Sequence, residues 1–119
     1  MSSDTACFCF LGEYGMAKGY IVALLKFTDP EQFIENYANK IPTVLEAHGG
    51  RFLVRTPISH FGEGREYSLH VIIEFDSFDK AQEMMNSADF KKLTPHRHGN
   101  TDHSASSFML LEGGDELAH

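Results

Sequence analysis

Residues 18–32, KGYIVALLKFTDPEQ, contain the first two elements of the fold. The β-branched and aromatic side chains of Lys18–Phe27 predict a strand that is buried on both faces. The next residues predict a helix start, because Asp29 can cap the helix, Pro30 suits its first position and Gln32 can complete a capping box. A buried strand followed directly by a helix is therefore expected.

Apolar side chains then recur at helical spacing. The stripe consists of Phe33, Ile34, Tyr37, Ala38, Ile41, Val44 and Leu45. Pro42 falls inside this stripe, where it removes one backbone donor and crowds the carbonyl of Ala38, so we expect a kink or break near Lys40. Gly49 and Gly50 predict the end of the helix, with one of them in the left-handed conformation.

The rest of the sequence predicts three further strands and a second helical region. We predict strands at Arg51–Pro57 and Tyr67–Phe75, a helix capped by Ser77 and ending at about Met85, a helical turn over Ala88–Leu93, a polar loop over His96–Ser104 and a strand over Ala105–Leu111. The strands at Arg51–Pro57 and Tyr67–Phe75, the second and third of the fold, are expected to form a hairpin with its turn in Phe61–Gly64. Thr94 and Pro95 are expected to stop the short helical turn.

This β-α-β-β-α-β order predicts an α+β fold, the ferredoxin-like split βαβ. Its four-stranded antiparallel sheet carries both helices on one face. The other face would also carry apolar side chains, because such residues occur at both parities of the first and third strands. A second copy of the same sheet is the economical cover, so we expect a homodimer that associates through its sheet faces.

Composition limits the classes of function. The 119 residues carry 17 acidic and 10 basic side chains, a formal net charge of −7, which disfavours nucleic acid and anionic membranes as partners. The longest apolar stretch, Tyr20–Leu25, is too short to cross a bilayer, and the first residues do not read as a secretory signal. Cys7 and Cys9 are too close for an ordinary disulfide. We therefore expect a cytoplasmic protein.

Several segments together resemble the domain of unknown function 1330 family. They are Tyr20-Ile21-Val22, Asp29-Pro30-Glu31, His48-Gly49-Gly50-Arg51-Phe52-Leu53-Val54-Arg55, Val71-Ile72-Ile73-Glu74-Phe75 and Asn86-Ser87 with Phe90 and Leu93. The resemblance implies a dimeric α+β barrel, a superfamily that includes monooxygenases, isomerases and haem proteins. It covers about Lys18–Gly113, so we expect an N-terminal extension over 1–17, a domain over 18–113 and an acidic C-terminal tail over 114–119. The family commonly has a proline where this chain has Asp76, and Met16 is the point at which the usual domain begins.

The strongest candidate site lies on two neighbouring strands. Alternation places Arg51 and Arg55 on one face, and His70 and Glu74 on one face of the next strand. A two-residue turn brings all four side chains together, whereas a bulge would separate them. Arg51 or Arg55 could hold a carboxylate or enolate while His70 or Glu74 moves a proton. The alternative is a structural Arg51–Glu74 ion pair beside a hydrogen-bonded histidine.

Further candidates lie outside these strands. Tyr37 could present its hydroxyl to the same pocket or simply belong to the core, and His48 is placed to cap a helix C-terminus. The loop that contains His96, Arg97, His98 and His103 is expected to be a solvated surface, with a lid from which Arg97 reaches the pocket as the alternative. We predict neither a metal site nor an organic cofactor.

These residues favour a small-molecule protein. The leading hypothesis is binding or cofactor-independent proton transfer, of the isomerase, cyclase or lyase type, on a small acidic or enolisable compound. A cofactor-independent monooxygenase would use the same pocket. A non-catalytic ligand-binding protein, or a haem or metal protein, is the third possibility.

Overall fold

Strand β2 (Gly19–Leu25) occupies the centre of the sheet. The computed structural model describes residues 17–117. Ile21, Ala23 and Leu25 are buried beneath the helices, whereas the side chains between them are only partly buried on the opposite face. The expectation of a strand buried on both faces is therefore wrong for a single chain, because nothing in residues 17–117 covers the second face.

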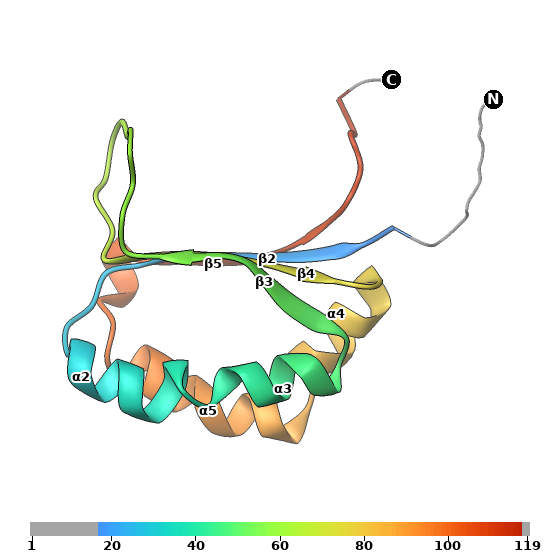
Figure 1. Ribbon diagram of the computed structural model, residues 1–119, viewed down its shortest axis with the longest axis horizontal. Helices are drawn as coiled ribbons and strands as arrows, with labels where there is room; N and C mark the ends of the chain where they lie inside the picture. The colour runs from blue at the N-terminus through green and yellow to red at the C-terminus, as the bar shows by residue number, and fades with distance from the viewer. Residues whose placement is uncertain (1–16, 118–119) are drawn as a thin grey trace.

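Nine further elements complete the described chain (Figure 1). They are helix α2 (Pro30–Phe33), π-helix η1 (Ile34–Ala38), helix α3 (Ile41–Ala47), strand β3 (Gly50–Thr56), strand β4 (Leu69–Phe75), helices α4 (Phe78–Met85) and α5 (Ala88–His98), 3₁₀-helix η2 (His103–Ala105) and strand β5 (Ser107–Glu112). The strand order is β3-β4-β2-β5, with every neighbouring pair antiparallel. The helices pack on one face of the sheet, which confirms the ferredoxin-like α+β fold.

The helical segment after β2 is broken where the sequence predicted it. Asp29 caps α2 by accepting a hydrogen bond from the backbone N–H of Gln32. Regular α-helix ends at Phe33, and a π-helical turn carries the chain to Ala38 before α3 restarts at Ile41, next to Pro42. Gly49 follows α3 with a φ of 74°, the left-handed conformation expected at this end.

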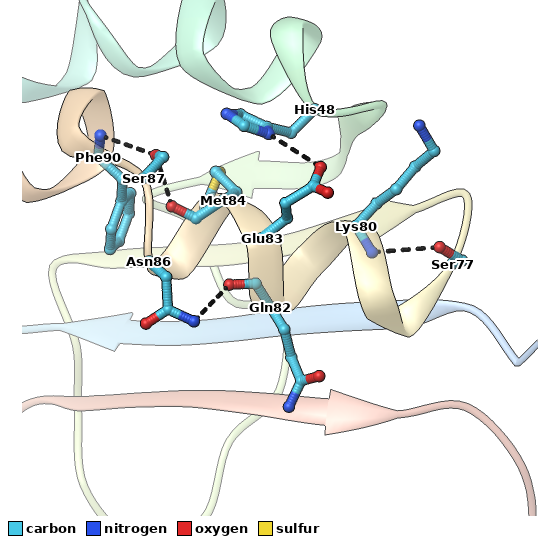
Figure 2. A network of polar contacts seen from close by, with 9 residues as sticks. All are labelled: His48, Ser77, Lys80, Gln82, Glu83, Met84, Asn86, Ser87 and Phe90. Carbon is cyan, nitrogen blue, oxygen red and sulfur yellow. Dashed lines mark hydrogen bonds and ion pairs between the residues drawn. The ribbon is translucent and has the colours of Figure 1, made fainter.

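Serine side chains start both helices of the second half (Figure 2). Ser77 accepts a hydrogen bond from the N–H of Lys80 at the start of α4. Ser87 accepts from the N–H of Phe90 at the start of α5 and donates to the carbonyl of Met84. The two bonds of Ser87 fix the corner between α4 and α5.

Helix α5 corrects the prediction of a short turn that ends before Pro95. It runs through Pro95 to His98, because its end is well capped. Gly99 donates to the carbonyl of Pro95, and Thr101 donates its hydroxyl to the carbonyl of Arg97. The burial of Arg97 also fixes this last turn, so packing outweighs the local signal of proline.

Strand β3 contains a bulge that the hairpin argument did not include. Arg51 lies opposite Glu74 as predicted, but the register shifts between Phe52 and Val54. Arg55 therefore faces Val71 rather than His70. Because one inserted residue reverses every later side chain, Arg51 and Arg55 lie on opposite faces of the sheet, and the prediction that they share a face is wrong.

The sheet face opposite the helices is open and largely apolar, and it is called the open face below. Strand pairing brings Val54, Ile72, Val22 and Met109 into one row across it. The loop 57–68, called the arm, rises from the same side (Figure 1). It carries Ile58 and Phe61, which are 63% and 81% exposed. Among the described helices none is both long and apolar enough to cross a membrane.

Candidate functional site

A cavity lies between the sheet and the helices. Its walls are Ala23, Leu25, Phe33, Tyr37, Ala38, Ile41, Phe52, Arg55, Leu69, Val71, Ile73, Arg97 and Phe108. Most of these side chains are apolar, and three polar ones, Tyr37, Arg55 and Arg97, were each predicted to bind a ligand. The volume is about 30 Å³, room for about two water molecules. A larger ligand would require one wall to move.

Tyr37 and Arg97 meet inside this cavity wall. The Nη1 of Arg97 donates a hydrogen bond to the Tyr37 hydroxyl oxygen at 3.2 Å. The tyrosine oxygen is therefore an acceptor in this contact, and its own O–H proton is available for another partner. Burial raises the pKa of the Tyr37 hydroxyl, while the Arg97 charge opposes that rise. Tyr37 is thus a neutral hydrogen-bond donor in the physiological range of pH.

Arg97 is a buried cation held by aromatic rings. It is only 7% exposed, and its guanidinium carbon lies 4.0 Å from the ring centroid of Phe108, with Phe90 and Tyr37 farther away. Within residues 17–117 no carboxylate forms an ion pair with it. A buried charge without a counter-ion is costly. The arrangement is therefore typical of a site that receives an anion.

Arg55 lies at the rim of the same cavity. Two charged residues line the cavity, and of these Arg55 is exposed whereas Arg97 is buried. The Arg55 guanidinium stacks over Phe52, 4.2 Å from the ring centroid, and its Nη1 donates to the carbonyl of Ala38 at 3.1 Å. Pro42 leaves that carbonyl without its usual helical donor, because proline has no N–H. Two weak contacts thus hold a long, exposed side chain across the opening.

The open face holds a separate polar row. Glu74 accepts from the Nε of Arg51 at 3.1 Å and from the hydroxyl of Tyr20 at 3.0 Å, and Arg51 also pairs with Asp76 at 3.0 Å. The bond from Tyr20, followed by the bond from Arg51, lowers the pKa of Glu74. Its two oxygens are both used, as expected of a structural ion pair.

His70 lies on the open face but apart from that row. It is paired with Thr56, and its Nδ1 lies 3.0 Å from the Thr56 carbonyl oxygen. A carbonyl can only accept, so Nδ1 of His70 donates its proton in this contact. The ring of Tyr67 meets it edge-on. His70 and Glu74 therefore do not line the cavity that contains Tyr37, Arg55 and Arg97.

The structure divides the six candidate residues into two groups. Tyr37, Arg55 and Arg97 surround the cavity, whereas Arg51, His70 and Glu74 lie on the open face. The sequence argument missed Tyr20 as the second partner of Glu74, although pairing of the first and third strands at the sheet centre would have indicated it. It also missed the Ala38 carbonyl, for which a proline four residues later was the available signal.

Two of the histidines that were predicted to lie in a polar loop, His96 and His98, belong instead to the end of α5. His96 and His98 lie on a helix, where residues two apart point in different directions, and His98 meets His103 edge-on. Among residues 17–117 no group of three or more His, Cys, Asp or Glu side chains is placed to hold a metal ion. Cys7, Cys9 and residues 1–16 of the expected N-terminal extension lie outside the described residues. The cytoplasmic location stays a prediction.

His48 ends α3 and contacts the helix beyond it (Figure 2). Its Nδ1 lies 3.8 Å from Oε1 of Glu83 on α4. This contact ties the two helices together on the far side of the sheet from the open face, which agrees with a structural rather than a ligand-binding role.

Several solved structures are similar to this chain over most of its length. A protein of unknown function from Rhodopseudomonas palustris matches with a TM-score of 0.66 and 15% identity, over 84% of this chain and 85% of that one. SnoaB, a cofactor-independent oxygenase from Streptomyces nogalater, matches with a TM-score of 0.57 and 14% identity, over 87% and 99%. An ethyl tert-butyl ether D family protein from Bacillus halodurans gives 0.55 and 18%, over 83% and 100%. These likenesses agree with the element order of the chain and establish the ferredoxin-like α+β fold.

The chain belongs to the family described as domain of unknown function DUF1330, which matches residues 18–113. This confirms the resemblance seen in the sequence. No protein with a curated function matches the chain.

Proposed function

We propose that the chain binds a small acidic or enolisable compound in the cavity between sheet and helices and catalyses proton transfer on it. The observation that carries the proposal is Arg97, a buried guanidinium with no carboxylate partner in residues 17–117. An anionic ligand would supply the missing counter-charge. Arg97 and Tyr37 would then donate to the same oxygen, where negative charge grows as an enolate forms.

Tyr37 stabilises the enolate, the role that the sequence hypothesis gave to Arg51 or Arg55. No Asp, Glu or His lines the cavity within residues 17–117, so the proton that leaves the ligand's carbon passes to solvent water. The Tyr37 oxygen accepts from Arg97, so its O–H is left to donate toward the ligand. The raised pKa of Tyr37 keeps that proton in place in the free protein. A neutral donor beside a fixed cation is suited to stabilise an enolate without a metal ion.

Arg55 serves as the movable wall of the site. The cavity of about 30 Å³ is too small for most metabolites, and Arg55 is the exposed side chain at its rim. Rotation of Arg55 away from the Ala38 carbonyl would admit the ligand. The same guanidinium could then pair with a carboxylate on the ligand.

The proposal includes a homodimer formed through the open face. Leu53, Val54, Met109 and Leu111 are between 37% and 51% exposed there, and monomers rarely leave such a contiguous apolar area in water. The arm adds Ile58 and Phe61, which rise from the same side and could reach across to the partner. The Arg51–Glu74 pair would then lie inside the interface, already neutralised.

Deuterium exchange tests the proton transfer directly. Small 2-oxo acids are incubated with the protein in D₂O, and incorporation at the carbon beside the carbonyl is followed by proton NMR. Loss of one oxyanion donor costs about 10²–10³-fold in rate, so Tyr37→Phe should show a loss of that size while the apparent affinity changes little. Arg51→Met, which removes an equally charged side chain from the open face, is the matched control and should exchange at the wild-type rate. Equal rates in wild type and Tyr37→Phe would refute the role of Tyr37.

A cofactor-independent oxygenase is the second candidate, because SnoaB, which shares the fold, is described as one. The electron-rich enolate held by Arg97 and Tyr37 is also the species that could react with oxygen. An oxygen electrode separates the two functions. Oxygen uptake in step with substrate loss, with no added flavin or metal, would favour the oxygenase, and deuterium exchange without uptake would favour simple proton transfer.

A further inference from the structure

A second, more polar pocket lies outside the cavity, at the end of α5 and against β5. Its volume is about 400 Å³, and its polar lining consists of Arg97, His98, Thr101, His103, Ser106 and Ser107. Arg97 lines both this outer pocket and the inner cavity, whereas His98 lines only the outer pocket. The two spaces are therefore neighbours that share one guanidinium but differ in every other polar group.

The guanidinium of Arg97 has donors to spare. It carries five N–H groups, and within the described part of the chain only two contacts use them, to Tyr37 and to His98. The side chain is 93% buried, the complement of its 7% exposure. A buried guanidinium with unused donors and no carboxylate is a polar group that lacks its partner.

His98 is neutral in this arrangement, and the hydrogen bond shows why. The Nη2 of Arg97 lies 3.2 Å from Nε2 of His98, and because arginine cannot accept, the imidazole nitrogen must. That nitrogen therefore carries no proton. Burial, followed by the charges of Arg97 and His103, lowers the pKa of His98, in agreement with a neutral ring.

The charged groups around His98 are few. From its own helix Arg97 faces it, and from η2 the ring of His103 packs edge-on with centroids 5.0 Å apart. The nearby Asp102 carboxylate accepts instead from the N–H and hydroxyl of Ser104, and Arg65 of the arm donates to the Ser104 carbonyl. The lining from β5 is uncharged. Protonation of the imidazoles would thus gather positive charge with no opposing carboxylate at the pocket.

We propose that the outer pocket is a binding site for a tetrahedral oxyanion, a phosphate group free or esterified, held by Arg97, His98 and His103. The donors exceed what the two oxygens of a carboxylate can accept, and they suit three oxygens of a phosphate. Ser106 accepts from the N–H of Lys26, so its O–H remains available as a further donor. This site shares Arg97 with the inner cavity, whereas its other donors, His98 and His103, line the outer pocket alone.

Binding at this site takes up a proton. When the anion arrives, Arg97 turns its free donors to the anion, and His98 no longer serves as an acceptor. The imidazole nitrogen then gains a proton and donates to the anion. Affinity should therefore rise as pH falls from 8 to 6, by about tenfold for each unit by which the anion raises the pKa of His98.

Sulfate is the first probe, since it keeps both charges throughout this range of pH. The full chain is titrated with sodium sulfate while the imidazole resonances are followed by NMR at pH 6 and pH 8. We expect tighter binding at pH 6 and a rise in the pKa of His98. Glycerol 3-phosphate forms a second arm. Binding of both probes indicates a site open to phosphate esters, and binding of sulfate alone indicates a site for the free anion.

His98→Gln is the decisive variant. Glutamine can still accept from Arg97 but cannot gain a proton, so sulfate affinity should become nearly independent of pH. His96→Gln, which changes a histidine on the same helix outside the pocket, should keep the wild-type profile. An unperturbed His98 at pH 6, or the same pH profile in His98→Gln, would overturn the proposal. Because His98 does not line the inner cavity, either result leaves the exchange experiment with 2-oxo acids to be judged separately.

Discussion

Arg55 donates a hydrogen bond to the carbonyl oxygen of Ala38 at a distance of 3.1 Å, and this bond joins an edge strand to the helical layer. The oxygen is free because Pro42, four residues later, has no N–H to offer it. The bulge in β3 completes the arrangement, since it turns Arg55 toward the helices. Two local irregularities, on different elements, thus meet in one contact at the rim of the cavity.

That contact predicts a coupling between two substitutions. Arg55→Met should lower the free energy of unfolding by about 0.5–1.5 kcal/mol, the usual contribution of one hydrogen bond. In a Pro42→Ala background the loss should be smaller, because the alanine N–H can bond to the Ala38 carbonyl instead. Urea unfolding of the four proteins of the double-mutant cycle measures this coupling. Arg51→Met combined with Pro42→Ala is the control and should give additive losses.

The close packing around Gly50 predicts that any larger side chain at the start of β3 would clash with its neighbours. A Cβ placed there would lie 2.7 Å from Cε2 of Phe75, a fully buried ring. Gly50→Ala should therefore lower stability by about 1–3 kcal/mol, as overpacking usually does. The control is Gly62→Ala, whose added carbon would come no closer than 3.7 Å to the Ser59 hydroxyl. Thermal melts in which the two variants lose equal stability would contradict the close approach.

Glu74 predicts an acid-sensitive part of the stability. Its pKa is lowered in the folded state by Tyr20 and then Arg51, so the unfolded chain binds more protons in the window from the ordinary value of 4.5 down to the folded value. The stabilisation is complete above that window and is lost as pH falls through it. Melting temperatures of wild type and Glu74→Gln should therefore differ at pH 7 and converge as pH falls through that window. Glu63→Gln, on the arm, serves as the control and should follow the wild-type curve.

If the dimer forms through the open face, one charged side chain introduced there should prevent association. Met109 is 38% exposed at the β5 end of the apolar row, and Ile34 is 49% exposed on the helical layer. Met109→Glu should yield a monomer of about 13.4 kDa by light scattering, because a buried carboxylate without a partner opposes association. Ile34→Glu should leave the mass at twice that value. A wild-type chain that is already monomeric at micromolar concentration would end the proposal of a dimer.

Local signals were sufficient for the order of the elements. The runs of β-branched and aromatic residues in β2 and β4, the caps at Asp29 and Ser77, and the break at Pro42 each depend on residues close together in the chain. These signals act within a few residues, so the sequence displays them directly. The split βαβ topology then follows from handedness.

The candidate site was harder to predict because it depends on one residue of register. Leu53 is the extra residue of the bulge, and nothing in its neighbourhood distinguishes it from the rest of an apolar strand. Its effect is nevertheless large, because Arg55 no longer lies opposite His70 but lines the same cavity as Tyr37 and Arg97. The end of α5 depended likewise on distant packing, because the burial of Arg97 against Phe108 holds a turn that Pro95 alone would not favour.

The bulge at Leu53 also determines which edge of the sheet could accept another strand. β3 and β5 are the two outer strands, and an outer strand with a regular row of free N–H and C=O groups invites further pairing. The irregular step at Leu53 interrupts that row on β3, whereas the pairing of β5 with β2 is regular throughout. Growth of the sheet into a fibrous aggregate would therefore begin along Ser107–Glu112, where Glu112 places its charge at the end of the strand.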